Sequence, residues 1–360
     1  MMIKNPHKNY GLPSENGLAV GEVSTDTKLA QSLFALCPAA HITPLLIQDD
    51  LAGAFGVGRT FIKDERERMG LGSFKALGAA YAIAKAAAGR VQDGSATSYD
   101  TALTGQTYVC ASAGNHGLSM AAGAKLFGAE AVVYLSETVP ENFAGRLAAK
   151  GATVVREGEY YEASMEAAKN AAATNGWNLL SDSSWVGYSE PARDVMEGYL
   201  IMAAEAADQV PEPPTHLFLQ AGVGGLAAAC TAGARQVWGE TVTICIVEPE
   251  AAPALKASIE AGTAVTAPGP VSCMGRLDCK DPSHLALKYL AREADAFMTV
   301  TEAEAHDTVA MLQNFGIESS PSGTAGIAGL RKLSADPANP LNLNDRSRVL
   351  LYVSEGPADD

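Results

Sequence analysis

The sequence is poor in cysteine, in positive charge and in long apolar runs, and each shortage excludes a class of protein. Its six cysteines are scattered over 360 residues and do not form the dense framework of a disulfide-rich secreted domain. With 26 Lys and Arg against 41 Asp and Glu, the net charge is −15, whereas a nucleic-acid binder needs a basic face. The sequence contains no stretch of about 18 apolar residues that could cross a membrane. It also contains no run of Lys and Arg that could recruit an anionic membrane. We expect a soluble, cytoplasmic protein with no nucleic-acid or membrane partner.

Short β-branched runs alternate with alanine-rich stretches along the whole chain. This alternation is typical of an α/β protein with parallel sheets covered by helices on both faces. The expected strands cover residues 59–63, 107–110, 131–135, 153–156, 216–220, 242–247, 297–300 and 348–353. The expected helices include residues 76–90, 118–127, 161–173 and 226–237. Thr301 and Glu304 have the spacing of a capping box, which predicts a further helix start.

Lys75 stands at the mouth of an almost wholly apolar helix, directly after Phe74. Burial disfavours an ammonium group, so it lowers the pKa of a lysine and makes the amine nucleophilic. Such an amine is suited to forming a Schiff base. The alternative is a lysine whose stem covers apolar surface while its ammonium group reaches water.

The run from Ser112 to Gly117 lies between an expected strand and an expected helix. Small residues such as Gly114 leave backbone N–H groups free to converge on an anion at a helix N-terminus. Asn115 adds an amide that could hold a ring hydroxyl or a carboxylate. The alternative is an ordinary turn in which Asn115 caps the helix and His116 is packed inside.

Gly222, Gly224 and Gly225 occupy a second turn between a strand and a helix. Glycines allow close backbone approach, and the helix start favours a phosphate. The run does not fit G-x-G-x-x-G and is not followed by Lys-Ser/Thr, which argues against dinucleotide and P-loop sites. A glycine turn that serves only helix–sheet packing is the alternative.

Ser354 ends the last expected strand, where ligands bind in open α/β sheets. It could equally be a surface serine in a frayed tail. Together, however, the four features are a buried amine, a loop for a substrate anion, a loop for a phosphate and a hydroxyl for a ring nitrogen. These are the parts of a pyridoxal-phosphate site.

In this order and spacing, the four stretches resemble the fold-type II pyridoxal-phosphate enzymes, the tryptophan synthase β family. Within that family the chain is most similar to the diaminopropionate ammonia-lyases. Asp182 and Cys279 also fall where those enzymes have Asp and Cys. The resemblance implies two open α/β lobes with pyridoxal phosphate in the cleft between them, residues 75–189 forming a small mobile lobe, and residues 1–74 with 190–360 forming the large cofactor-binding lobe. It also implies a homodimer.

The resemblance further assigns roles to individual residues. Lys75 forms the Schiff base with the cofactor and shuttles the Cα proton, and Asp182 is a second catalytic group. Ser354 pairs with the ring nitrogen, with Ser322 as second candidate for that contact. The remaining implied contacts are Asn115 to the phenolic oxygen, Gly222, Val223, Gly224 and Gly225 to the phosphate, and Ser112, Ala113, Gly114 and His116 to the substrate; no metal site is implied.

Two positions depart from the diaminopropionate lyases. Those enzymes have an Asp at the position of Ala113, whereas this loop is similar to that of serine and threonine dehydratases. Arg276 lies where the family has small uncharged residues, and it could bind a charged substrate group by bidentate pairing. We favour slightly the alternative that Arg276 is a surface residue paired with Asp278. Cys273 and Cys279 could form a redox pair, but two free thiols are the expectation for a cytosolic protein.

The expected function is a carbon–nitrogen lyase that eliminates ammonia from 2,3-diaminopropionate, or from a related β-substituted amino acid, to give a keto acid. The alternative is a dehydratase for serine, threonine or 3-hydroxyaspartate, which the Ser112-Ala113 sequence favours. A protein that binds pyridoxal phosphate without catalysis is disfavoured, because Lys75 and both anion loops are intact.

Overall fold

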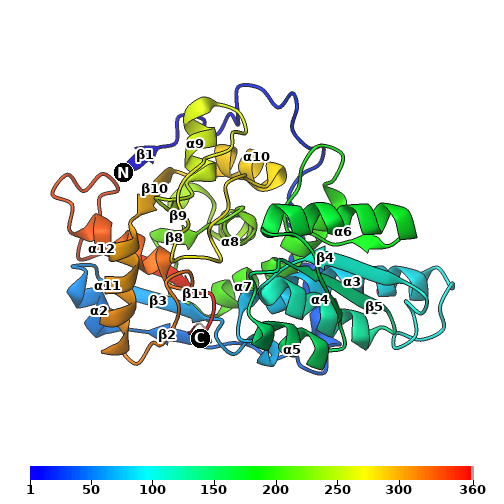
Figure 1. The fold of residues 1–360 in the computed structure, drawn as a ribbon. Coiled ribbons are helices and arrows are strands. Elements are labelled where there is room, and N and C mark those ends of the chain that lie inside the picture. Colours follow the sequence, from blue (N-terminus) through cyan, green and yellow to red (C-terminus); the bar gives the residue numbers. More distant parts are fainter. Residues whose placement is uncertain (358–360) are drawn as a thin grey trace.

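The computed structural model describes residues 1–357 and places their strands in two sheets. The larger sheet has seven strands, in the spatial order β1 (Met2–Lys4), β10 (Ala296–Val300), β9 (Thr243–Pro249), β8 (His216–Gln220), β11 (Arg348–Val353), β3 (Arg59–Asp64) and β2 (Leu45–Ile47). The smaller sheet has the order β6 (Thr153–Arg156), β5 (Glu130–Leu135), β4 (Thr107–Ala111) and β7 (Asn178–Leu179). Figure 1 shows the larger sheet on the left and the smaller one on the right.

Both sheets are parallel except at the edges of the larger one, where β1 runs antiparallel to β10 and β2 antiparallel to β3. The α/β class is therefore confirmed, and all eight expected strands are present. The sequence does not predict β1, β2 or β7, which have only two or three residues each. Runs this short cannot show the alternation from which a strand is recognised.

The helices cover the faces of the two sheets (Figure 1). They are α1 (Thr27–Ala35), α2 (Asp49–Ala54), α3 (Gly78–Gln92), α4 (Asn115–Leu126), α5 (Glu141–Ala149), α6 (Tyr161–Asn175), α7 (Glu190–Gln209), α8 (Gly225–Trp238), α9 (Ala254–Ala261), α10 (His284–Glu293), α11 (Glu302–Gln313) and α12 (Ala325–Ser334). Three short 3₁₀ helices are η1 (Arg68–Gly70), η2 (Phe74–Leu77) and η3 (Gly239–Thr241). The predicted capping box is confirmed at α11, where the Thr301 hydroxyl accepts from the Glu304 N–H. Within residues 1–357, no helix has the length and apolar character needed to span a membrane.

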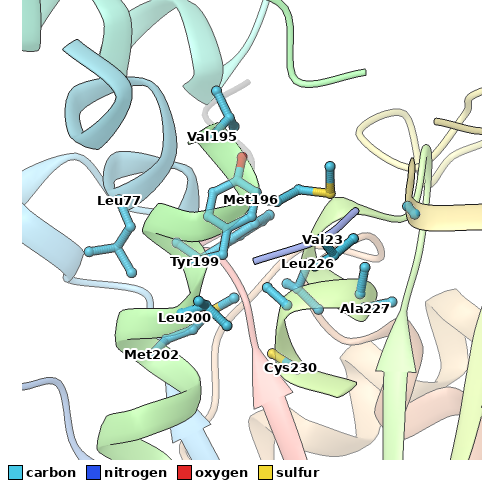
Figure 2. Close-up of a cluster of buried hydrophobic side chains, with 14 of the residues drawn as sticks. Val23, Leu77, Val195, Met196, Tyr199, Leu200, Met202, Leu226, Ala227 and Cys230 are labelled. Carbon is cyan, nitrogen blue, oxygen red and sulfur yellow. The ribbon is translucent and has the colours of Figure 1, made fainter. Parts of the chain in front are cut away.

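Helix α7 lies at the junction of the two halves and packs on both. Figure 2 shows its side chains, Tyr199 among them, between Leu77 of η2 and Leu226 of α8. Gly198 makes the approach to η2 possible, because a Cβ there would stand 2.4 Å from the Leu77 carbonyl oxygen. The segment that contains Lys75 is therefore anchored on the longest helix of the described chain.

A buried ion network ties β3 to the far end of α7. The guanidinium of Arg68 pairs with Glu65 and with Glu205, each at 2.7 Å. Lys63 donates to the same Glu205 carboxylate at 2.7 Å. The side chains of Arg68 and Lys63 are fully buried, so each charge depends on these partners.

Candidate active site

Lys75 lies in η2, which begins directly after Ser73. The Ser73 hydroxyl caps this turn by accepting the Lys75 N–H at 3.3 Å. Its ammonium group pairs with Asp182 at 2.6 Å. Burial alone lowers the pKa of Lys75, but the adjacent carboxylate outweighs burial and leaves that pKa raised. The expectation of a lowered pKa is therefore wrong, because the sequence does not show that the loop after β7 brings Asp182 onto the lysine.

Asp182 is held in the ionised form by the same contact. Burial raises the pKa of its carboxyl group, but Lys75, and to a smaller extent His116, lower it well below the usual range. The proton of the pair therefore resides on Lys75. Asp182 can act as an acid only after it has received a proton from a neighbour.

The loop that begins at Ser112 follows β4 and leads into α4. The Ser112 hydroxyl accepts the N–H groups of Gly114 at 3.3 Å and Gly117 at 3.2 Å, so it shapes the turn. Ala113 is exposed at the tip. The first N–H groups of a helix have no partner within it, so the start of α4 at Asn115 is suited to a carboxylate.

His116 is buried beneath this loop rather than exposed on it. Its Nε2 contacts the Leu180 carbonyl oxygen at 2.8 Å, and its Nδ1 is buried without a hydrogen-bond partner in the described chain. Burial lowers the pKa of His116, with Asp182 opposing that effect. The ring is therefore neutral and connects α4 to the segment that carries Asp182.

The glycine loop lies between β8 and α8, at the carboxyl edge of the larger sheet. A Cβ on Gly222 would stand 3.0 Å from the Cys279 sulfur, and one on Gly224 would stand 3.0 Å from Ala286. Gly224 also has φ +102°, which disfavours side chains. A Cβ on Gly225 would stand 4.0 Å from the Asp182 carbonyl oxygen. The loop is thus a bare backbone cradle beside Asp182, and its donors fit the phosphate of pyridoxal phosphate.

Cys279 lies between this cradle and the lysine. Burial raises the pKa of its thiol to about 11, while Lys75 lowers it and Asp182 raises it. Both Cys279 and Cys273 are free thiols.

Ser354 follows β11 and lies next to the lysine segment, because its carbonyl oxygen accepts the Phe74 N–H at 2.9 Å. Its hydroxyl makes no hydrogen bond to another residue of the described chain. The hydroxyl of Ser322, by contrast, accepts the Arg276 N–H at 3.2 Å. Of the two serines, Ser354 therefore has the free hydroxyl.

Arg276 pairs with Glu355 at 2.5 Å, and Asp278 pairs instead with Lys280 at 2.5 Å. The favoured interpretation of Arg276 as a surface partner of Asp278 is therefore wrong. The side chain of Arg276 is one-third exposed and its guanidinium contacts a carboxylate of the site itself.

Two residues of the site are absent from the sequence prediction. Glu355, 3% exposed, contacts Arg276, Ser320 and Asn115. Tyr161, half-exposed at the start of α6, lies within electrostatic reach of Asp182. Glu355 follows Ser354 at the end of an expected strand, and this position could have identified it as a site residue. Nothing in the sequence around Tyr161 indicates a role in the site.

Comparisons with known proteins agree with this geometry. The family of pyridoxal-phosphate dependent enzymes matches residues 36–355. The diaminopropionate ammonia-lyase of Escherichia coli K12 is 30% identical over 371 residues, which is 96% of this chain and 93% of that protein. The human L-serine dehydratase/L-threonine deaminase is 30% identical over 210 residues, covering 58% of this chain and 61% of that one.

Solved structures show the same fold. The crystal structure of the E. coli diaminopropionate ammonia-lyase in complex with an aminoacrylate-PLP azomethine reaction intermediate has a TM-score of 0.86 at 28% identity, covering 99% of this chain and 93% of that one. The processed form of threonine deaminase isoform 2 from Solanum lycopersicum has a TM-score of 0.78 at 18% identity, covering 100% and 94%. The second match shows the fold alone.

Proposed function

Because the chain belongs to the pyridoxal-phosphate dependent enzyme family, we propose that it is an ammonia-lyase for 2,3-diaminopropionate. The reaction converts this substrate and water into pyruvate and two molecules of ammonia. Full-length similarity to the diaminopropionate ammonia-lyases supports the substrate. The structural observation that carries the proposal is the ion pair of Lys75 and Asp182, 2.6 Å apart beside the glycine cradle.

Bound pyridoxal phosphate supplies an electron sink for the negative charge that develops at Cα when its proton is removed. The backbone of residues 222–225 holds the phosphate, which the bare cradle at the start of α8 favours. The free hydroxyl of Ser354 contacts the ring nitrogen, and Asn115 contacts the phenolic oxygen. The carboxylate of the substrate binds the loop of Ser112, Ala113 and Gly114 at the start of α4.

Lys75 and Asp182 divide the proton handling between them. In its neutral form the Lys75 amine removes the Cα proton, and the carboxylate of Asp182 stabilises the ammonium group that results. The β-amine leaves only as ammonia, so it must carry a third proton, which it brings as an ammonium group or receives from Lys75 through Asp182. An ionised carboxylate at this place also binds the β-ammonium group of a diamino acid.

The second candidate is a dehydratase for serine, threonine or 3-hydroxyaspartate. It is favoured by Ala113, because the loop then lacks the carboxylate of the diaminopropionate lyases, and by the partial similarity to the serine dehydratases. Asp182 argues for the lyase, since a neutral β-hydroxyl group gains no charge pairing from it. Arg276 can bind a charged substrate group only if that group replaces Glu355 as its partner.

We further propose that the molecule consists of two lobes and forms a homodimer. We place the small lobe at residues 75–189 and the large lobe at residues 1–74 and 190–360, with closure of the small lobe excluding water from the reacting carbon. We also propose a homodimer in the cytoplasm.

The test measures keto acid and ammonia released by the cofactor-loaded protein from L- and D-2,3-diaminopropionate, serine, threonine and 3-hydroxyaspartate. We expect two ammonia per keto acid from diaminopropionate, turnover of one enantiomer only because Ala113 removes one candidate base, and little reaction with the hydroxy acids. Lys75→Ala should lose both the activity and the yellow absorption band. Turnover confined to a hydroxyamino acid would make the dehydratase correct.

A further inference from the structure

Glu355 has a carboxylate whose two oxygens have different partners. Its Oε1 accepts from Arg276 Nη1 at 2.5 Å and from the Ser320 hydroxyl. Its Oε2 accepts from Asn115 Nδ2 at 3.2 Å. The side chain is 3% exposed, so all three contacts are made away from water and are correspondingly strong.

The two sets of partners come from different halves of the molecule. Arg276 and Ser320 lie in loops beside the larger sheet, whereas Asn115 begins α4 beside the smaller one. The backbone of Glu355 is also fixed, because its carbonyl oxygen accepts the Ser319 hydroxyl at 2.6 Å. Glu355 is therefore held in place by residues beside the larger sheet, and its Oε2 accepts a hydrogen bond from Asn115 beside the smaller sheet.

This arrangement determines which way the amide of Asn115 faces. An ionised carboxylate only accepts hydrogen bonds, so the atom of Asn115 that faces Glu355 must be its nitrogen. That nitrogen carries two hydrogens, of which Glu355 takes one. The second remains for another acceptor, and the amide oxygen is kept on the opposite side.

We propose that Glu355 is a positioning residue that locks the amide of Asn115 so that its second N–H donates to the phenolic oxygen of the cofactor. The inference rests on the proposed function, because it requires pyridoxal phosphate in the site. A donor at this oxygen stabilises its anionic form and so lowers the pKa of the bound cofactor.

Glu355→Gln gives the sharpest test. It preserves the shape of the side chain but reverses the direction of the hydrogen bond between residue 355 and Asn115. Arg276 and Ser320 both donate, so they hold the new amide oxygen and leave its NH₂ group facing Asn115. Asn115 must then turn its oxygen toward Gln and toward the cofactor. We expect at least about tenfold weaker cofactor binding and a higher pKa in the pH titration of the cofactor's absorption band.

Three further variants separate positioning from simple stabilisation. In an Asn115→Ala background, Glu355→Gln should have no further effect on the band or the affinity, because the residue through which it acts is gone. Asp295→Asn is the matched control, since Asp295 pairs with Arg235 at 2.8 Å at the opposite edge of the sheet, and it should leave both readouts unchanged. Should Glu355→Gln fail to fold, Glu355→Asp keeps the charge but withdraws it from Asn115, and it should weaken cofactor binding while Arg276 remains paired.

An unchanged band and affinity in a folded Glu355 variant, or an equal effect with and without Asn115, would overturn the inference and leave the proposed function standing. A wild-type protein that takes up no cofactor would overturn the proposed function as well.

Discussion

The carboxylate of Asp182 controls the charge of the lysine beside it. Burial and ion pairing act in opposite directions on Lys75, and the pairing prevails. On Asp182 the same pairing also prevails over burial. The two groups therefore form a partly buried ammonium–carboxylate pair, and removing either charge leaves the other without its main partner.

Asp182→Asn should lower the pKa of Lys75, because it removes the largest effect that opposes burial. We expect cofactor to combine with the apoprotein faster at pH 7, since only the neutral amine reacts, and the pH profile of that rate to move to lower pH. Lyase turnover should nevertheless fall by about 10² to 10⁴-fold, as for the loss of a general acid–base group.

Rapid-mixing absorbance measurements over a pH range check the combination rate, and steady-state kinetics check the turnover. Asp194→Asn, which removes the carboxylate 2.8 Å from Lys85, is the control and should change neither. A slower combination rate in Asp182→Asn would contradict the role assigned to the pair.

At the scale of the elements, the sequence predicts the longer strands and several of the helices, but not the longest helix of the described chain. The eight expected strands and α3, α4, α6 and α8 are recognised within a few residues of their observed bounds. Helix α7 is not among the predicted helices. Its sequence nevertheless carries usable indications, namely Pro191 in the first turn and acidic side chains at helical spacing at positions 190, 194, 197, 205 and 208.

Some residues of the candidate site can likewise be predicted from the sequence, and others cannot. The glycine cradle and Ser354 lie at strand ends, and Lys75 lies just before an apolar helix; these are local patterns that can be read from the sequence. Glu355 acts through Asn115, 240 positions away, and through Ser320, 35 positions away. Contacts of this kind depend on the folded topology and leave no local pattern.

Gly198→Ala should disrupt the contact between α7 and the lysine segment. The new Cβ would stand 2.4 Å from the Leu77 carbonyl oxygen and 2.8 Å from the Tyr81 Cβ. Since neither atom belongs to a flexible side-chain end, we expect a loss of about 2–3 kcal/mol of unfolding free energy and weakened activity. Urea denaturation measures the first and the lyase assay the second.

Gly145→Ala provides the matched control for this substitution. Gly145 is an exposed position within α5 with no atom within 4 Å of a new Cβ. Alanine there should stabilise the protein by about 0.5–1 kcal/mol. Equal effects at the two positions would refute the packing argument.

At the scale of the whole molecule, the buried network of Lys63, Glu65, Arg68 and Glu205 makes stability depend on acid pH. Burial alone raises the pKa of Glu205, but Arg68 and Lys63 outweigh it and lower that pKa below the ordinary value of 4.5. The stabilisation is thus complete above pH 4.5 and is lost as the pH falls through the lowered folded-state pKa.

Glu205→Gln should lower the unfolding free energy at pH 7 by about 3 kcal/mol, because Arg68 and Lys63 remain buried with one carboxylate fewer. Its stability should also fall less steeply than that of the wild type below pH 4.5. Urea denaturation at pH 7 and at intervals below pH 5 checks both. Glu141→Gln, at an 86% exposed side chain, should change stability by less than about 1 kcal/mol, and a similar loss there would refute the network's role.

Strand β11 lies between β8 and β3 in the larger sheet, although it follows both of them in the sequence. During synthesis on the ribosome, β3 and β8 emerge long before the strand that must join them. The larger sheet stays open at its centre until residue 353 has left the exit tunnel, and Ser354 and Glu355 arrive later still. A nascent chain halted before residue 348 therefore carries Lys75 and the glycine cradle but cannot complete the cofactor site. Cofactor binding is thus a late event, and it indicates that the larger sheet has formed.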